Sequence, residues 1–357
     1  MKAFEDLQRE VHEPGLCRCC GGCVAYCSAL NFGAIGMGSE GPPRYVDADQ
    51  CVECGVCYAI CPATAVFDEA VRKRLKWREP VGNVLSLWTG QARDSRTAAQ
   101  GTDGGVATAL LAHLLERGAI DGAVLARREG IFSARPVLAS DRESILASAG
   151  SALDLAPSMG DFGGWYGTFS DSLRALGRVR EGGFERLAFV GTGCQVMALR
   201  KMEAYGVMPS ESIALALGLF CSGSFLFGPR EREILEHMGN FRWESVRKLN
   251  LREEFQIHLR SGETRFIPLD AMEFALRPAC RFCGDYSAEY ADLSFGGLGS
   301  EEGWTTAVAR TPAGRFALAA AVPALELRRF GDTEALERIV ALSQWKRARA
   351  ARWKGSG

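Results

Sequence analysis

The sequence predicts a small cysteine-rich α+β domain at the N-terminus, followed by a larger α/β domain. Most of the thirteen cysteines lie between residues 17 and 61, where long periodic segments are absent. From residue 84 onward, short apolar runs alternate with segments of helical spacing, as in α/β domains. The length of 357 residues is also more than one small core requires.

Composition excludes several classes of protein. The apolar fraction of 47% and the charged fraction of 24% are those of a globular protein, and the net charge of −1 argues against nucleic-acid binding. The most apolar run, residues 213–227, contains glycines and serines and is too short for a bilayer helix. Residues 1–13 lack the apolar core of a secretory signal. We therefore expect a cytoplasmic protein that reaches a membrane only by docking to another complex.

Two cysteine runs define the N-terminal domain, which we place at residues 1–70. Both have the spacing C-x2-C-x2-C-x3-C: Cys17, Cys20, Cys23 and Cys27, then Cys51, Cys54, Cys57 and Cys61. A [4Fe–4S] cluster needs four thiolates, and in two-cluster ferredoxins the fourth cysteine of each run binds the other cluster. The runs therefore predict a ferredoxin-like domain that transfers electrons. One cluster is assigned to Cys17, Cys20, Cys23 and Cys61, and the other to Cys51, Cys54, Cys57 and Cys27.

The alternative for these runs is a pair of zinc sites. Zinc usually takes two C-x2-C pairs or cysteine with histidine, and neither run has that form. Cys19 lies inside the first run without altering its spacing, so we interpret it as a spare thiol.

A basic connector at residues 71–83 leads to the main domain at residues 84–330. The connector, which includes Arg72-Lys73-Arg74, is typical of a solvated linker or helix face. In the main domain we expect strands at 84–87, 122–126 and 187–190, helices at 105–117 and 195–203, a buried strand and turn within 213–227, and a hairpin at 255–259 and 264–269. A basic helix at 333–352, in the C-terminal segment 331–357, is either a docking element or a solvated helix end.

Four cysteines lie outside the N-terminal domain: Cys194, Cys221, Cys280 and Cys283. The first two follow apolar strand-like runs, and the last two form a C-x2-C pair. Four thiolates are what a third cluster needs. The alternative is that the first two are buried small residues and the pair is redox-active on its own.

A glycine-rich turn, Gly101-Thr102-Asp103-Gly104-Gly105, precedes the helix predicted at 105–117. Free backbone amides and the helix dipole at such a turn favour a phosphate group. The spacing is not that of a dinucleotide-binding fingerprint, so the turn alone is a weak signal.

Several segments taken together resemble the β-subunit family of coenzyme F420-reducing hydrogenases and dehydrogenases. They are residues 101–111, 191–196, 218–221, the pair Cys280 and Cys283, 291–299, 303–306 and 310–311. The match covers roughly residues 84–320 in the family's order, and the two-cluster head is most similar to the input subunit of F420H2 dehydrogenases. One departure is Gly193, where the family usually has proline.

The resemblance implies that the α/β domain binds FAD. Gly101, Thr102, Asp103, Gly104, Gly105 and Thr108 would hold the flavin phosphates, and Gly150 with Ser151 would form a second contact. Cys194, Cys221, Cys280 and Cys283 would bind a [4Fe–4S] cluster near the flavin.

The resemblance also implies an F420-dependent oxidoreductase. Reduced coenzyme F420 would pass hydride to FAD, and single electrons would leave through the clusters, in a reaction reversible in principle. No general acid or base is expected, so we predict no catalytic side chain. The acceptor would be a partner protein, either a membrane complex that reduces a quinone or methanophenazine, or a soluble reductase. The coenzyme's anionic tail would need a basic groove, from residues 72–78 or from Arg252, Arg260 or Arg265.

Two alternatives stay open. The resemblance also extends to a ferredoxin-dependent reductase of an organic substrate, such as a chlorophyll-type pigment, from the same superfamily. In that case electrons would run inward from the clusters to FAD. A non-catalytic relay subunit would only pass electrons between partners, but it would have no use for a flavin phosphate site at residues 101–105.

Overall fold

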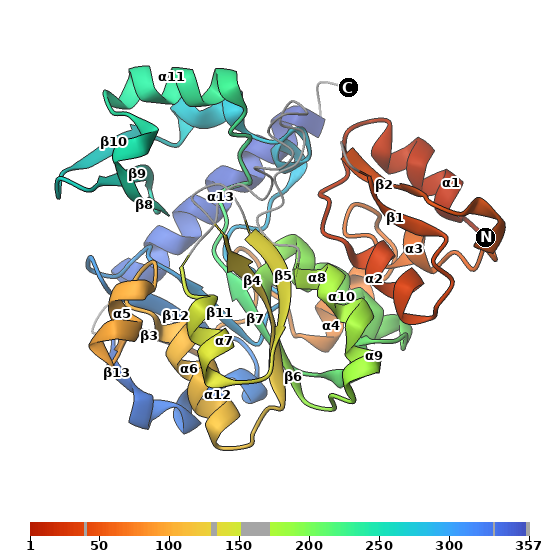
Figure 1. Cartoon of the computed structure of the whole chain (residues 1–357), viewed down its shortest axis with the longest axis horizontal. Helices are drawn as coiled ribbons and strands as arrows, with labels where there is room; N and C mark the ends of the chain where they lie inside the picture. Colours follow the sequence, from red (N-terminus) through yellow and green to blue (C-terminus); the bar gives the residue numbers. More distant parts are fainter. Residues whose placement is uncertain (39–40, 130–133, 151–171, 331–332, 355–357) are drawn as a thin grey trace.

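The computed structural model describes the chain except for residues 39–40, 130–133, 151–171, 331–332 and 355–357. Its N-terminal unit lies at one end of the molecule (Figure 1). This unit consists of α1 (Phe4–Leu7), a π-helical turn (Gln8–His12), α2 (Gly22–Ala29), the antiparallel strands β1 (Ile35–Gly38) and β2 (Gly41–Tyr45), a 3-10 turn (Ala48–Gln50), α3 (Val56–Ala59) and α4 (Asp68–Arg74).

The two cysteine runs of this unit share one local structure. The first two cysteines of each run lie in a loop that ends at a glycine in the left-handed region, Gly21 at φ 80° and Gly55 at φ 72°, and the third lies in the helix that follows. A residue with a Cβ is strained at such a φ, which explains the glycines. Phe4, Leu7 and Val11 pack around the cysteines, so the unit has a small apolar core of its own.

The main domain is built on an eight-stranded sheet in the order β13-β3-β12-β11-β7-β6-β4-β5. The strands are β3 (Ser86–Ala92), β4 (Gly122–Arg128), β5 (Ala134–Ala139), β6 (Leu187–Thr192), β7 (Ile213–Leu219), β11 (Leu293–Gly296), β12 (Thr305–Ala309) and β13 (Leu325–Arg329). The four central strands β11, β7, β6 and β4 are parallel, and the strands at both edges pair antiparallel. The parallel strands therefore end at one edge of the sheet.

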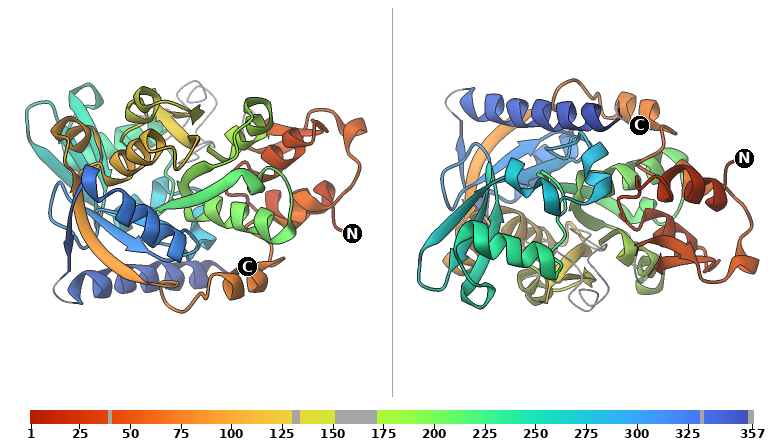
Figure 2. Two further views of the ribbon diagram at one scale, coloured as in Figure 1. Left: turned by 90° about the horizontal axis from the view of Figure 1, so that it is seen from below. Right: turned by 90° about the horizontal axis from the view of Figure 1, so that it is seen from above.

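Helices cover both faces of this sheet, as the alternation along β7 illustrates. Leu215 and Leu217 face the side covered by α6 (Val106–Glu116), α7 (Arg142–Ala147) and α12 (Pro312–Ala320), whereas Ala216 faces α10 (Gly193–Tyr205). On the same side as α10, the long helix α13 (Glu334–Lys354) packs Ile339 against Val308 of β12. The blue α13 runs along one side of the molecule in both views of Figure 2.

A second, smaller sheet forms a unit that the sequence did not separate from the main domain. It contains β8 (Val246–Leu251), β9 (Glu254–Leu259) and β10 (Thr264–Pro268), and α11 (Pro229–Gly239) packs on it. Its own apolar core includes Phe227, Leu235 and Phe255. The remaining short elements are α5 (Ser95–Gln100), α8 (Ser172–Ala175), α9 (Val179–Gly182) and 3-10 turns at Leu176–Arg178, Ser210–Ser212, Trp243–Ser245, Asp270–Ala275, Pro278–Phe282 and Val322–Ala324.

The predicted helices at 105–117, 195–203 and 333–352 are confirmed as α6, α10 and α13, and the predicted hairpin is confirmed as β9 and β10. The expected strand at 84–87 begins only at Ser86 and continues to Ala92. Within the described part of the chain, no helix is long and apolar enough to cross a membrane.

The segment expected to be a solvated linker is packed against the main domain. Its first residues belong to α4, where Val71 is buried. The Trp77 indole N–H donates to the Glu289 carboxylate at 2.8 Å, and the Arg72 guanidinium donates to the Tyr290 hydroxyl at 3.4 Å. These contacts hold residues 71–83 against the main domain.

Candidate functional site

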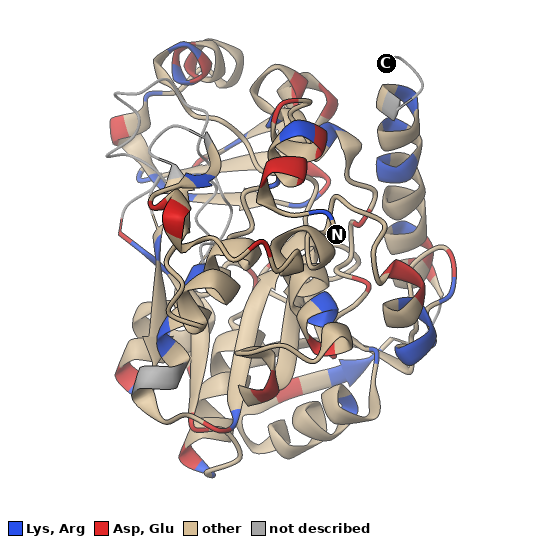
Figure 3. Cartoon of the chain, turned by 90° about the vertical axis from the view of Figure 1, so that its right-hand side faces the viewer, with Lys and Arg blue, Asp and Glu red and all other residues tan. Residues whose placement is uncertain are grey.

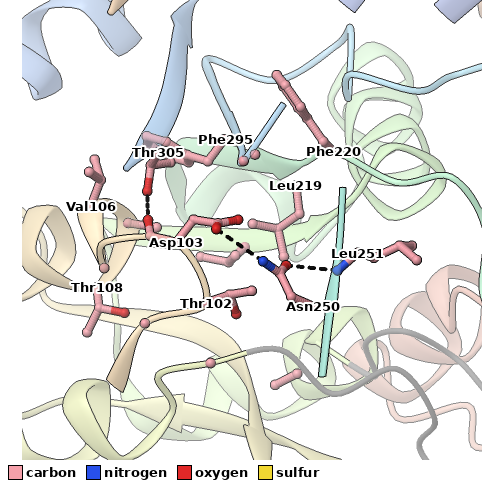
Figure 4. A pocket seen from close by; sticks show the side chains of 18 of the residues that line it. Thr102, Asp103, Val106, Thr108, Leu219, Phe220, Asn250, Leu251, Phe295 and Thr305 are labelled. Carbon is pink, nitrogen blue, oxygen red and sulfur yellow. Dashed lines mark hydrogen bonds between the residues drawn. The ribbon is translucent and has the colours of Figure 1, made fainter. Parts of the chain in front are cut away.

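A cavity of about 190 Å³ lies where the parallel strands of the main sheet end (Figure 4). Ligand sites in open α/β sheets usually occupy this edge. Most of its walls are apolar: Val106, Leu111, Leu125, Ile145, Val190, Leu219, Phe220, Leu251 and Phe295 line it. Such walls suit a flat ring system and exclude water from it.

The glycine-rich turn forms the polar side of this cavity. Gly104 (φ 72°) and Gly105 (φ 69°) are left-handed, and Gly105 caps the N-terminus of α6. A Cβ at Gly105 would collide with the backbone carbonyl of Thr97, and a Cβ at Gly104 with that of Gly303. The sequence therefore needs glycine at both positions, and the amides in the first turn of α6, which have no carbonyl partner within the helix, suit a phosphate.

The structure brings most of the predicted flavin contacts to this cavity. Gly101, Thr102, Asp103, Gly105, Thr108 and Gly150 line it, and Gly104 adjoins them in the turn. Ser151 lies outside the described residues. The Asp103 carboxylate is directed toward the small sheet, where it accepts from the Asn250 amide at 3.1 Å. Burial raises the pKa of Asp103.

The small sheet supplies two cavity residues that the sequence did not indicate, Asn250 and Leu251, and its cations hold the neighbouring backbone. The Lys248 ammonium donates to the carbonyls of Gly101 (3.0 Å) and Thr102 (2.5 Å), and Arg252 donates to the carbonyls of Gly297 and Ser300. Strand β8 thus clamps the glycine-rich turn. In the sequence, these residues could have been recognised only by the alternation of polar residues at 248, 250 and 252. A strand that faces solvent shows the same alternation, so the pattern does not identify a site.

The structure brings Cys27 together with Cys51, Cys54 and Cys57. These four thiols line a small cavity of about 30 Å³ whose other walls include Phe4, Tyr26, Phe32 and Ile35. Burial, followed by the charges of Cys54, Cys51 and Cys27, raises the pKa of Cys57 to about 12. Four thiols around an apolar hollow, with the fourth from the other run, fit the ligand set of a [4Fe–4S] cluster.

The other four cysteines of the N-terminal unit also converge. The pKa of Cys17 is raised by a hydrogen bond with Cys19, by burial, and by Cys61 and Cys23. Burial raises the pKa of Cys20, with Cys61 among its charged neighbours. Cys17, Cys20, Cys23 and Cys61 therefore share one environment.

Cys194, Cys221, Cys280 and Cys283 come together from three elements of the main domain. Cys194 lies in the first turn of α10, Cys221 follows β7, and the other two lie in and just after the 3-10 turn Pro278–Phe282. Burial raises the pKa of Cys221 to about 12, against the charge of Lys346 and with that of the other three thiols. Cys221 also lines the main cavity, so this third cysteine group adjoins it.

The three groups follow one another away from the cavity. Cys20 has Cys194 of the third group as a charged neighbour, and Cys23 has Cys57 of the group around Cys51. The order is therefore cavity, third group, first group, second group. Within the described ranges, no three Cys, His, Asp or Glu side chains come close enough to bind a single metal ion. The thiols of Cys27, Cys51, Cys54 and Cys57 are instead spread around a common hollow.

Buried cations surround the third cysteine group. Lys346 of α13 donates to the carbonyls of Cys221 (2.5 Å) and Asp285 (2.7 Å), and Arg349 donates to the carbonyl of Ser222 (2.9 Å). The Nε atoms of Arg18 and Arg349 are buried without a hydrogen-bond partner. Such orphaned donors are rare, and the sulfur atoms of a cluster would satisfy them. The residues present therefore fit an anionic cluster.

These contacts also explain the terminal helix. Lys346 and Arg349 are only 1% and 5% exposed, so these two charges are not part of a solvated helix end, which was one of the two interpretations of this basic helix. Figure 3 shows several Lys and Arg residues in the last turns of this helix, beside the label C. The thiols of Cys283 and Cys221 raise the pKa of Lys346 despite its burial, which keeps it charged.

Cys19, expected as a spare thiol, has a partner in the main domain. The Arg277 guanidinium donates to its sulfur at 2.9 Å and to the Arg18 carbonyl at 3.3 Å. Nearby, Lys201 of α10 donates to the carbonyls of Cys61 (2.9 Å) and Thr64 (2.6 Å). Buried cations thus fix the N-terminal unit to the main domain.

The structure explains why residue 193 is glycine, which the sequence alone did not. A Cβ at this position would collide with the Asp285 carboxylate. Asp285 Oδ1 accepts from the Glu289 amide at 3.1 Å, while Oδ2 is buried without a partner. Glycine at 193 therefore makes room for a carboxylate beside the third cysteine group.

Comparison with known proteins identifies relatives. Residues 87–160 and 184–332 match the models for the N-terminal and C-terminal parts of the coenzyme F420 hydrogenase/dehydrogenase beta subunit, and residues 44–67 match a 4Fe-4S binding domain. The beta subunit of the coenzyme F420 hydrogenase of Methanosarcina barkeri is 28% identical over 66% of this chain and 77% of that protein. One of the subunits of the F(420)H(2) dehydrogenase of Methanosarcina mazei is 26% identical over 76% and 83%.

A solved structure shares the fold. A chain of the F420-reducing [NiFe] hydrogenase complex from Methanosarcina barkeri superposes with a TM-score of 0.66 and 26% identity, covering 77% of this chain and 93% of that chain. The architecture of the main domain is therefore that of a chain in an F420-reducing complex.

Proposed function

This chain belongs to the coenzyme F420 hydrogenase/dehydrogenase beta-subunit family, an oxidoreductase family of F420-linked iron–sulfur subunits. We propose that it oxidises reduced coenzyme F420 through a bound FAD. Electrons then leave one at a time through three [4Fe–4S] clusters to a partner protein.

The observation that carries this proposal is the position of Cys221. It lines the main cavity and is also one of the four thiols of the third cysteine group. A ring system in the cavity would therefore lie beside a cluster, which is the juxtaposition that electron transfer between them requires.

The cavity suits FAD in its polarity. Bound FAD would supply the conversion between a hydride pair and single electrons. The chain's own residues would bind and orient it, with amides of the glycine-rich turn facing phosphate and apolar walls facing the rings. Leu219, Phe220 and Phe295 at the ends of β7 and β11 would exclude water from the reacting face.

The cysteine groups provide a route from the cavity to the far end of the N-terminal unit. The second group lies last in this order, and Val52 and Glu53 beside its cysteines are exposed. We therefore assign electron exit to this end, where a membrane complex or a soluble reductase would dock. The buried cations between the groups would stabilise added electrons along the route.

The test is anaerobic mixing of the cluster-loaded, FAD-loaded protein with F420H2 and a viologen dye. We expect the FAD and cluster absorbance to bleach and the dye to become reduced. A Cys221→Ser variant should still bleach FAD but reduce the dye far more slowly. Iron analysis should give about twelve atoms per chain, and about eight would remove the third cluster.

Other outcomes would redirect the assignment. Rapid reduction by ferredoxin without any reaction with F420H2 would mean that electrons run inward to an organic substrate. Absence of flavin from the anaerobically purified protein would leave only a relay role.

A further inference from the structure

A second hollow adjoins the main cavity, with which it shares Thr102 and Gly150. Three cations stand around it: Arg128 at the end of β4, and Arg247 and Lys248 of β8. We call these three residues the basic rim. They come from two different sheets, more than a hundred residues apart in the sequence, so only the fold brings them together.

Two residues of the basic rim are available to a ligand. Arg128 and Arg247 are exposed, and neither forms an ion pair with another described residue. Lys248 is half-buried, and two of its hydrogen bonds go to carbonyls of the glycine-rich turn. It adds positive charge to the hollow but also has a structural role.

Few acids offset this charge. Among the charged neighbours of Lys248 are Asp103 and Glu302. The Asp103 carboxylate already accepts from Asn250 and lies 3.9 Å from the Arg252 guanidinium. The hollow therefore keeps an excess of positive charge at the mouth of an apolar cavity, a combination that fits a ligand with flat rings and an anionic tail.

We propose that the basic rim binds the anionic tail of the deazaflavin coenzyme, which carries a phosphate and glutamate carboxylates. This inference rests on the proposed function. The pyrophosphate of FAD has the same chemistry and is the other possible source. Two features favour the coenzyme: the inner amides of Gly104 and Gly105 provide a separate phosphate site, and the rim is open to solvent, as exchange of a substrate requires.

The basic residues considered from the sequence have other contacts. Arg252 donates to carbonyls of Gly297 and Ser300, and Arg265 pairs with Glu263 at 3.0 Å. Arg72 donates to Tyr290. None of these three residues lines the second hollow, so the basic rim replaces them as the tail site.

The experiment compares two ligands by titration calorimetry on the FAD-loaded protein. One is oxidised coenzyme F420, and the other is the same deazaflavin without phosphate and glutamates. In the double variant Arg128→Ala, Arg247→Ala we expect the Kd of the full coenzyme to rise at least tenfold, with the tail-free ligand and the FAD content unchanged. Arg260→Ala is the matched control: this exposed arginine lies in the turn after β9 and, although the sequence offered it as a tail contact, it does not line the second hollow, so it should change neither.

Four results would overturn the proposal. Equal weakening of the binding of both ligands, or no weakening for either, would show that the basic rim does not bind the tail. Loss of FAD with an unchanged ratio of the two ligand affinities would assign the rim to the flavin pyrophosphate. If the wild-type protein binds neither deazaflavin, the proposed function itself fails, and this inference fails with it.

Discussion

Replacing Gly193 by alanine should destabilise the protein, and the structure identifies the cause. Gly193 is the first residue of α10, where alanine would ordinarily be favoured by up to about 1 kcal/mol. Here the added Cβ would lie 2.7 Å from Asp285 Cγ and closer still to Oδ2. The carboxylate is buried and held by the Glu289 amide, so it cannot move away without losing that bond. Overpacking of this kind costs about 1–3 kcal/mol.

A double-mutant cycle isolates the contact. In the Asp285→Ala background the obstacle is absent, so Gly193→Ala should be neutral or stabilising by up to about 1 kcal/mol. The coupling energy between the two positions should be of the order of 1–3 kcal/mol. Anaerobic urea unfolding of the four proteins, followed by circular dichroism, measures it, and iron content reports whether the third cysteine group keeps its ligands.

The reasoning would be refuted if Gly193→Ala cost the same free energy with and without the Asp285 carboxylate. A neutral effect in the wild-type background would refute it as well. The same logic applies to Gly193→Pro. Proline suits the first turn of a helix, yet here its ring would meet the same carboxylate. This explains why the chain departs from the proline usual in the family at this position.

Three further predictions concern charge, flavin binding and pH. Lys346→Met removes a buried positive charge beside the third cysteine group, so the midpoint potential of the cluster proposed there should fall by at least about 59 mV, a tenfold change for one electron. A potentiometric titration read by electron paramagnetic resonance measures this potential, and an unchanged or higher value would contradict the role given to Lys346. Gly105→Ala forces a side chain into φ 69° against the Thr97 carbonyl, so it should lower the free energy of unfolding by at least about 1–2 kcal/mol and reduce the flavin retained on purification. Gly118 is also left-handed but lies away from the cavity, so Gly118→Ala should lower stability without loss of flavin. Burial lowers the pKa of His12 from 6.5 to about 4, so protonation of the imidazole in the unfolded chain opposes folding, and stability should fall as the pH drops from 6.5 toward 4. The difference between the urea midpoints at pH 7 and pH 5 should be smaller in His12→Gln than in the wild type, and the same difference in both proteins would exclude His12 as the cause.

The sequence by itself determined the features that depend on near neighbours along the chain. The spacing of Cys51, Cys54 and Cys57 places two thiols on one loop and the third in the first turn of α3, because a short loop ending at a left-handed glycine has few conformations. Apolar periodicity likewise predicted α6, whose buried Val106, Leu110 and Leu114 recur at helical spacing. Family resemblance extended this to a predicted flavin site at the glycine-rich turn, but it could not say what each charged side chain contacts.

Only the tertiary structure decided the roles of charges that are distant in sequence. In the sequence, Lys346 and Arg349 are two of several charges in a basic helix, with nothing to indicate their partners. In the structure they are buried and donate to the carbonyls of Cys221 and Ser222, beside the third cysteine group. Arg128 and Arg247 lie far apart in the sequence, yet the two sheets place both of them at the second hollow. The physical reason is that the effect of a charge depends on the dielectric and the partners around it, and these come from segments that the chain folds together from far apart.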